Sequence, residues 1–573
     1  MNKLKFPNPI SIRENIEYLD GVWSFSFNGK DWQDITVPFS PESKLSGIEY
    51  KDFIPVCYYK KTFKLNNKSE KVYINFGAVD YMTQVFINDK YVGSHKGGYT
   101  SFSIDVTDFV NNGENSIYMI VRDDEIYNSA RGKQSYKKQS FGCFYTRTTG
   151  IWQSVWLEFL PENRVSECKM ITDINAPSVT LQLKTTGCGK YNIQVLYKGK
   201  LVGESDGEIC YQKDVKVLLS EKHLWELGHG RLYDVIVFYE QDVYKTYFGL
   251  RTVEFNGYEF LLNGKSVIQK LVLNQGYNPQ GVLTYPNVDL MQKDIDLALE
   301  LGFNGARLHE RVFNPRFLYL CDVKGFMVWG EYPSWGIDYS KLDGLGQLIS
   351  EWTENVNRDF NHPSIVMWCP LNEVWGAWEK PEKIGDVRYA EALYKLTKVL
   401  DNTRPCVDVS GGFHSGVTDL FDFHCYEDLD KLEKYLDELE QKDLLEVPLL
   451  YPPTNAVKYK KGQPVQLSEC GGFAFGKYIT ESSQAETVNT VVLSESAWGY
   501  GKMETDGNVF VDRYVKLINL LSKYKKLSGF CYTQLYDIEQ EQNGFYYYDR
   551  SDKLSKKQKE KIKEANNEMF IKK

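Results

Sequence analysis

Hydrophobic and polar positions alternate in short runs over the first 253 residues, and this pattern predicts strands rather than helices. Residues 72–76 and 191–197 are such runs, and turn-forming pairs such as Asn28-Gly29 separate them. Alternation over a few residues is typical of strands with one buried face. The pattern favours a jelly roll or sandwich over residues 1–164 and an immunoglobulin-like β-sandwich over residues 165–253.

The pattern changes at about residue 254, where apolar runs of strand length begin to alternate with helical runs. Residues 289–301 show helical spacing, with leucine and isoleucine positions that would face a core. Strand-length runs over residues 254–573 are 271–274, 305–309, 326–329, 365–371, 406–409, 421–426, 465–468 and 529–532. Strands that alternate with helices in this number indicate a C-terminal (β/α)8 TIM barrel. A doubly wound sheet is the alternative, and the lack of a glycine-rich phosphate turn disfavours it.

Length and composition indicate a multidomain globular chain. The 573 residues exceed what one hydrophobic core usually supports, so two to four domains are expected. Aromatic residues make up 14% of the chain, which suits strands and also surfaces that bind sugar rings. The net charge of −9, without a long basic run, argues against nucleic acid as a partner.

The sequence contains no recognisable membrane, metal or cofactor motif. No stretch approaches the ~20 apolar residues of a membrane helix, and no apolar segment follows the first lysines. The 11 cysteines are scattered and form no Cys-x-x-Cys pair, so we expect free thiols and a cytoplasmic location. We find no zinc spacing, P-loop or dinucleotide fingerprint, and therefore expect neither a metal nor a cofactor.

Two glutamates follow predicted barrel strands, where the catalytic groups of such barrels lie. Glu373 comes directly after Asn372 at the end of the fourth strand, and Glu469 ends the seventh strand close to a Gly-Gly pair. Each alone could be a solvated carboxylate. Together they suggest glycoside hydrolysis, in which one carboxyl group protonates the leaving oxygen and the second attacks or activates water.

Four further residues at strand ends or in nearby loops are candidates for binding. Arg307 could pair with Glu469 and lower its pKa, or could form a purely structural ion pair. His309 and Tyr426 also follow predicted strands, although a lone histidine is more often a packed group than a ligand. Trp498 could be a stacking platform for a sugar or an ordinary packing residue.

Four longer motifs follow one another along the chain, at residues 35–48, 95–102, 149–156 and 361–373, the last of which ends in Leu-Asn-Glu. They resemble glycoside hydrolase family 2, which contains β-galactosidases, β-glucuronidases and β-mannosidases. The first three look like the family's galactose-binding-like jelly roll, and the fourth is similar to its acid/base signature. The resemblance covers nearly the whole chain and implies a jelly roll, an immunoglobulin-like sandwich and a catalytic TIM barrel.

The resemblance also implies a role for each candidate. Glu373 becomes the general acid/base and Glu469 the nucleophile of a reaction that retains anomeric configuration through a covalent glycosyl-enzyme. Asn372 would contact the sugar 2-hydroxyl, Tyr426 would hold the nucleophile, and Trp498 would form a wall of the pocket. The partner is therefore a carbohydrate, and the formation of a homo-oligomer stays open.

Departures from the family's motifs affect the choice of sugar. The Arg-x-x-His motif of many members is replaced by Arg307-Leu-His309, so the role of His309 does not carry over directly. Residues 541–550 lack the lysine of the Asn-x-Lys motif that reads the substrate carboxylate in family glucuronidases. A neutral β-linked sugar such as galactose is therefore our main expectation. A β-glucuronidase that uses Arg311 or Arg316, an arabinosidase-type enzyme and an inactive glycan-binding protein are the alternatives.

Overall fold

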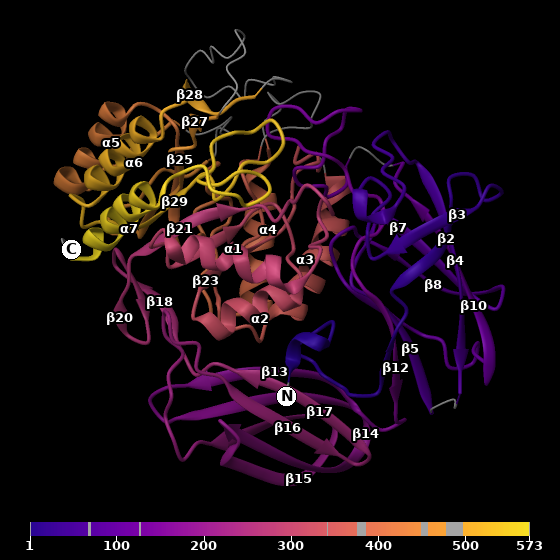
Figure 1. Ribbon diagram of the computed structural model, residues 1–573. Helices are drawn as coiled ribbons and strands as arrows, with labels where there is room; N and C mark the ends of the chain where they lie inside the picture. Colours follow the sequence, from indigo (N-terminus) through magenta and orange to yellow (C-terminus); the bar gives the residue numbers. More distant parts are fainter. Residues whose placement is uncertain are drawn as a thin grey trace.

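The computed structural model describes residues 2–66, 70–124, 128–340, 342–374, 385–448, 456–476 and 497–571. Two β-rich regions flank a barrel that is covered by helices (Figure 1). The first region lies beside the barrel, and the second lies beneath both. The domain boundaries themselves stay predictions.

Two antiparallel sheets form the first region and enclose a core between them. The larger sheet has the order β3 (Gln33–Val37), β2 (Gly21–Ser26), β4 (Val56–Leu65), β10 (Gly113–Arg122), β7 (Met82–Ile87) and β8 (Lys90–Lys96). The smaller sheet has the order β1 (Ile16–Tyr18), β12 (Val155–Leu160), β5 (Lys71–Phe76) and β9 (Phe102–Asp105), and β6 (Val79–Asp80) pairs with β11 (Gly150–Ile151). In β5, Val72 and Ile74 are buried in the core while Tyr73 lies on the opposite face, as strand alternation requires. The predicted pair of packed sheets is confirmed.

The second region is a sheet that folds over itself. Its strands are β13 (Val165–Asp173), β14 (Ser178–Tyr197), β15 (Lys200–Leu218), β16 (Tyr233–Tyr239) and β17 (Asp242–Phe248). The register of β14 shifts between Lys184 and Cys188, and its two halves pair with different neighbours, β13 and β16. The result confirms the predicted β-sandwich. Cys188 and Cys210 face each other in β14 and β15 and are joined by a disulfide, so the expectation of free thiols is wrong for this pair.

A small sheet leads from the sandwich into the barrel. It consists of β18 (Val253–Asn256), β19 (Glu259–Leu262) and β20 (Lys265–Ser266). The barrel strands that follow are parallel, in the order β24 (Ile365–Cys369), β23 (Met327–Glu331), β22 (Gly305–Leu308), β21 (Gln269–Asn274), β29 (Leu527–Tyr532), β26 (Val465–Cys470) and β25 (Phe421–Cys425). Their residues are buried almost throughout, as expected for strands covered on both faces.

The predicted strand at 406–409 takes the eighth position of the barrel, but only as isolated bridges. Val407 donates to the carbonyl of Trp368, and Ser410 donates to the carbonyl of Leu371. Pro370, which follows β24, lies between these two contacts and has no N–H to donate. A continuous ladder is therefore interrupted at this point, and the TIM-barrel prediction holds with one irregular strand.

Helices cover the barrel where the sequence shows helical spacing. They are α1 (Val288–Glu300), α2 (Pro315–Lys324), α3 (Leu345–Asp359), α4 (Val387–Leu400), α5 (Leu429–Lys442), α6 (Gly507–Leu521) and α7 (Lys556–Ile571). Short elements are η1 (Lys3–Lys5), η2 (Lys44–Ser46), η3 (Leu342–Gly344), β27 (Phe473–Phe475) and β28 (Tyr500–Glu504). The start of α2 is capped by Asn314 ahead of Pro315, and its end by Gly325 in the left-handed conformation, which are the favoured residues at these positions. Among the described residues, no helix has the length and apolar character to cross a bilayer.

A loop of the first region, residues 129–147, docks onto the mouth of the barrel, and we call it the docking loop. Its Arg131 N–H donates to the carbonyl of Trp335, which follows β23. Phe141 and Phe144 of the loop pack against the Trp335 side chain in a small apolar cluster. The barrel mouth is therefore built from two regions of the chain.

Candidate active site

Two carboxylates meet at the mouth of the barrel. Glu469 lies at the end of β26, and Glu373 follows β24 across the barrel. Glu373 is 8% exposed and Glu469 is 5% exposed. One oxygen of each and one ring nitrogen of His424 lie within 4.8 Å of one another. The structure thus brings together the two glutamates that the sequence singled out.

Glu469 is held ionised by the groups around it. Arg307 Nη1 donates to its Oε1 at 3.0 Å, and the Tyr426 hydroxyl donates to its Oε2 at 2.5 Å. Burial alone would raise the pKa of Glu469, but the positive charges of His424, His309 and Arg307 outweigh it and hold the pKa well below the usual range. Burial and the neighbouring Glu469 raise the pKa of Tyr426, so its hydroxyl stays a donor.

Glu373 occupies an unusual backbone conformation beside His424. Its φ is +37°, in the left-handed region that residues other than glycine seldom adopt, and its N–H donates to the Ser410 carbonyl at 2.8 Å. His424 Nδ1 and Glu373 Oε1 are 2.5 Å apart. Burial would lower the pKa of His424, but Glu469 and Glu373 raise it above its ordinary value. His424 and Glu373 therefore share a short hydrogen bond.

Arg307 connects the two sides of the site. Its Nε donates to Glu331 at 2.6 Å and its Nη2 donates to the Asn372 side-chain oxygen at 3.1 Å. The main-chain oxygen of Asn372 accepts from the Trp335 indole at 3.0 Å, while its Nδ2 is buried with no partner among the described residues. A buried amide donor that has no partner is costly, and a ligand hydroxyl would satisfy it.

His309 and Trp498 lie at the edge of the cluster. His309 Nδ1 is 3.1 Å from Glu331 and 3.7 Å from Glu469. Burial lowers the pKa of His309. Trp498 donates from its indole to the Gly142 carbonyl at 2.6 Å, and its ring meets that of Tyr500 edge-on. Tyr500 in turn stacks on Tyr426, with 3.6 Å between ring centroids. Asn372, Glu373, Glu469, Arg307, His309, Tyr426 and Trp498 are therefore in or beside one site.

Two residues that other parts of the chain bring to this site, Lys133 and Glu541, were not among the candidates from sequence. Lys133, from the docking loop, is buried with its ammonium 3.9 Å above the Trp335 ring. Burial would lower the pKa of Lys133, but Cys143 and the carboxylates of Glu541, Glu469 and Glu373 raise it, so the ammonium is charged.

Glu541 is the second such residue. Burial raises its pKa, and it accepts hydrogen bonds from the Tyr145 hydroxyl and the Asn543 amide. Tyr145 belongs to the docking loop, so Glu541 also joins the two regions. Only the folded chain brings Tyr145 and Glu541 together, because they are far apart in sequence.

The two arginines considered for reading a sugar carboxylate are engaged elsewhere. Arg311 donates to the main-chain carbonyl of Leu283, and Arg316 donates to the Phe6 carbonyl and the Tyr18 hydroxyl. Neither forms a hydrogen bond with the carboxylate cluster within the described part of the chain. Their contacts do not support the alternative of a β-glucuronidase in which Arg311 or Arg316 binds the sugar carboxylate.

The cluster also has the composition of a cation site. Glu373, His424 and Glu469 offer three ligand atoms of the kinds that bind divalent metals. The nitrogen of His424 that faces both carboxylates already shares a hydrogen bond with Glu373. A metal ion would therefore compete with the proton held there, and the expectation of no metal stays a prediction.

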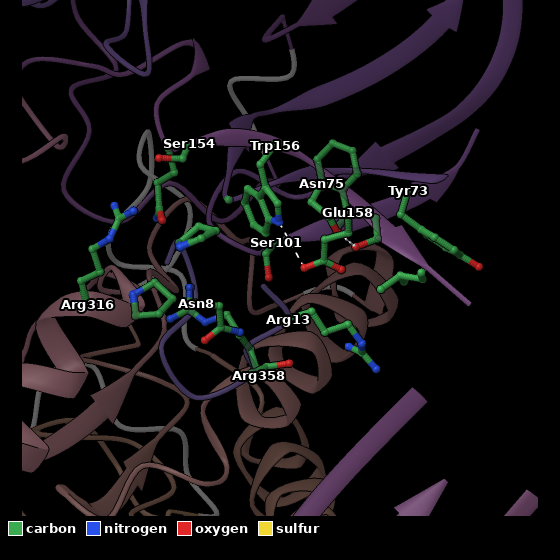
Figure 2. A pocket seen from close by; sticks show the side chains of 18 of the residues that line it. Asn8, Arg13, Tyr73, Asn75, Ser101, Ser154, Trp156, Glu158, Arg316 and Arg358 are labelled. Carbon is green, nitrogen blue, oxygen red and sulfur yellow. Dashed lines mark hydrogen bonds between the residues drawn. The ribbon is translucent and has the colours of Figure 1, made fainter. Parts of the chain in front are cut away.

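A cavity of about 470 Å³ lies apart from this cluster, where the smaller sheet of the first region meets the barrel. Figure 2 shows Asn75, Trp156 and Glu158 on one side and Arg316 and Arg358 on the other. The Trp156 indole donates to Glu158 at 3.2 Å. No residue of the carboxylate cluster lines this cavity, so it is distinct from the candidate active site.

Comparisons with known proteins agree on the family. A model described as the TIM barrel domain of family 2 glycosyl hydrolases matches residues 253–469, and one described as the sugar binding domain of that family matches residues 44–161. A beta-galactosidase of Thermoanaerobacter pseudethanolicus is 26% identical over 74% of this chain, which spans 57% of that relative's length. A beta-glucuronidase of Streptococcus agalactiae is 26% identical over 67% of this chain and 70% of its own.

Solved structures share the whole fold. A beta-D-glucuronidase structure from Dictyoglomus thermophilum has a TM-score of 0.79 and 20% identity, and a beta-galacturonidase from Eisenbergiella tayi has 0.76 and 19%, each covering 98% of both chains. These similarities confirm the architecture of sugar-binding-type domain, β-sandwich and barrel. Two models of one family match successive parts of the chain, and the chain therefore belongs to glycoside hydrolase family 2.

Proposed function

We propose that this protein is a retaining, exo-acting β-glycosidase that works through a covalent glycosyl-enzyme. The observation that carries the proposal is that Glu373 and Glu469 lie at the carboxyl ends of β24 and β26, with one oxygen of each within 4.8 Å of the other. Retaining enzymes hold their two carboxyl groups about 5–5.5 Å apart, whereas inverting enzymes need about 6.5–9.5 Å to admit a water. Burial of both carboxylates at a mouth covered by the docking loop favours the end of a glycan over its interior.

Glu469 is the nucleophile in this proposal. Attack on the anomeric carbon requires an ionised carboxylate, and Arg307 and Tyr426 stabilise that charge. The glycosyl–oxygen bond to Glu469 forms as the bond to the leaving oxygen breaks. In the second step water attacks the anomeric carbon, and Glu469 departs again as a carboxylate that accepts the same hydrogen bonds.

Glu373 is the general acid and then the general base. It delivers the proton that it shares with His424 to the leaving oxygen, and it regains a proton from the attacking water in the second step. In this proposal Asn372 donates to the sugar 2-hydroxyl from its Nδ2, which has no partner among the described residues. Hydrogen bonds to that hydroxyl strengthen in the transition state of glycoside hydrolysis.

The sugar is a β-linked uronic acid in our proposal, and a galactoside is the second candidate. Most of the similar solved structures are named as beta-glucuronidases or beta-galacturonidases, and curated relatives include both beta-glucuronidases and beta-galactosidases. This support favours the uronide alternative over our first expectation of galactose. The galactoside is favoured by one feature of the chain, the missing lysine of the Asn-x-Lys motif.

The test is a panel of nitrophenyl β-glycosides with the variant Glu469→Ala. We expect turnover of at least one sugar by the wild type, loss of that turnover in the variant, and rescue by azide with a glycosyl azide of inverted configuration. Glu433→Ala, which removes an exposed carboxylate on α5, is the control and should keep full activity. No turnover of any sugar, including arabinosides, would instead favour an inactive glycan-binding protein. Unchanged activity of Glu469→Ala would remove the nucleophile from the proposal.

A further inference from the structure

We propose that Lys133 of the docking loop reads the carboxylate of a uronic acid and thereby sets the substrate class of this site. The inference rests on the proposed function, because it names the group on the sugar that this glycosidase recognises. It assigns the recognition to a residue outside the barrel and outside the family motifs that the sequence displays.

The backbone around Lys133 is fixed against the barrel. Gly132 donates its N–H to the carbonyls of Pro333 and Trp335, and the carbonyl of Lys133 accepts from Tyr145. Gly132 has a φ of +58°, and a Cβ there would lie 2.4 Å from the Glu310 carbonyl oxygen. Only glycine fits this close approach, so the next residue is held at a defined position above the barrel mouth.

The ammonium of Lys133 lies over Trp335, whose indole donates to the Asn372 carbonyl at the carboxylate cluster. Its nitrogen lies 3.9 Å above the Trp335 ring, and the residue is 8% exposed. Across the described ranges, neither a hydrogen bond nor an ion pair engages this nitrogen, although Glu373, Glu469 and Glu541 are close enough to stabilise its charge. An ammonium has three donors, and the 8% exposure of this residue leaves little room for water to satisfy them. A ligand in the site would supply those acceptors.

Other cations near the site are already committed. Arg307 is bound to Glu331 and Glu469, Arg550 is bound to Asp294, and Lys553 is bound to Asp537. Lys133 differs from these three, because no acid in the part of the chain that the structure describes forms a hydrogen bond with its ammonium. A carboxylate on the sugar would complete this arrangement.

Glu541 is compatible with an anionic sugar close by. Its two oxygens accept from the Tyr145 hydroxyl and the Asn543 amide. Burial raises the pKa of Glu541, which eases proton uptake by this group when a second carboxylate binds nearby.

The experiment compares Lys133→Met with wild type on nitrophenyl β-glucuronide, β-galacturonide, β-galactoside and β-glucoside. We expect the wild type to prefer a uronide and the variant to lose about 100-fold or more in kcat/KM on it, as loss of one partner of a buried charge pair predicts. On neutral glycosides the change should stay below about fivefold, because no charge pair is lost there. Lys133→Arg keeps the charge and should retain more uronide turnover than Lys133→Met.

Lys137→Met is the matched control. Lys137 belongs to the same loop and also lies over an aromatic ring, 4.0 Å from the centroid of Phe141, but it is exposed. The Lys137→Met variant should keep the turnover of all four glycosides within about twofold of wild type, as surface changes usually do. Binding of free glucuronic and galacturonic acid by calorimetry, with a melting curve of each variant, gives a readout that does not depend on turnover.

The outcomes separate the two proposals. The role of Lys133 is overturned if the wild type prefers a neutral glycoside, or if Lys133→Met loses uronide and galactoside turnover equally. Either result leaves the proposed retaining glycosidase mechanism intact. Absence of turnover on every glycoside, with no azide rescue of Glu469→Ala, overturns the proposed function. In that case, uronic acid binding that is lost in folded Lys133→Met supports the recognition role, and binding that is kept overturns it.

Discussion

Replacing Tyr426 by phenylalanine removes one hydrogen bond from the proposed nucleophile and leaves the ring in place. The hydroxyl donates to Glu469 Oε2 at 2.5 Å and also contacts Thr533 Oγ1 at 2.9 Å. The ring stacks on Tyr500, and that contact survives the change. A hydrogen bond to a charged group contributes about 1.5–3 kcal/mol. Tyr426→Phe should therefore lower kcat roughly 10- to 150-fold, since 1.36 kcal/mol corresponds to a factor of ten.

The loss should fall mainly on the second chemical step. Glu469 leaves as a carboxylate in that step, and the Tyr426 hydroxyl stabilises the charge as it returns. Substrates with very good leaving groups, for which hydrolysis of the glycosyl-enzyme limits the rate, should therefore show the full loss in kcat and an accumulated intermediate. The pKa of Glu469 should rise when the donor is removed, so the acid limb of the pH–rate profile should move to higher pH.

The assay is steady-state and burst kinetics on aryl glycosides of graded leaving-group pKa, at several pH values. Tyr435→Phe is the control, because Tyr435 also donates its hydroxyl to a glutamate, Glu427 at 2.9 Å, but outside the cluster. Rates of Tyr426→Phe within twofold of the control on every substrate would refute the reasoning that this hydrogen bond supports the nucleophile.

Three further predictions concern the acid, the pH dependence of stability and metals. Glu373→Ala should lower kcat/KM by about 10²–10⁴ on substrates with poor leaving groups and far less on dinitrophenyl glycosides, and equal losses would count against its role as acid. Burial would lower the pKa of His414, but Asp408 raises it to about 9 in the fold from 6.5. Protonated His414 therefore contributes roughly 3 kcal/mol to the free energy of unfolding. This contribution is fully present below pH 6.5 and is lost as the pH rises through about 9. The melting temperature should fall over that pH range. An equally steep fall in a His414→Gln variant would contradict the assignment of this pH dependence to His414. Dialysis against a chelator should leave activity unchanged, and loss that a divalent cation restores would place an ion at Glu373, His424 and Glu469.

The sequence was sufficient for those parts of the site that lie at barrel strand ends. Apolar runs such as Ile365–Cys369 are long enough for a buried strand, and parallel strands bring their carboxyl ends to one edge. Glu373 and Glu469 could therefore be placed together although they are far apart in the chain. The same reasoning located Arg307 and Tyr426.

The contribution of the first region could not be predicted in this way. The contact of Lys133 with Trp335 depends on how the first region docks on the barrel, and no periodicity in either segment encodes that contact. The strand near Cys406 was predicted, but its irregularity was not. An apolar run does not show that the ladder depends on the missing N–H of Pro370 in the neighbouring strand. The disulfide between Cys188 and Cys210 depends on strand register, which spacing alone does not provide.

The docking loop has an evolutionary consequence. The proposed reaction groups belong to the barrel, whereas Lys133 comes from a loop of the first region, whose two sheets enclose a core of their own. Mutations in that loop can therefore alter which sugar is accepted while the chemistry is left intact. A chimaera that carries the first region of a relative should inherit the relative's preference, and a barrel expressed alone should lose discrimination. Selection for a new glycan can act on one region of this protein while the other is preserved.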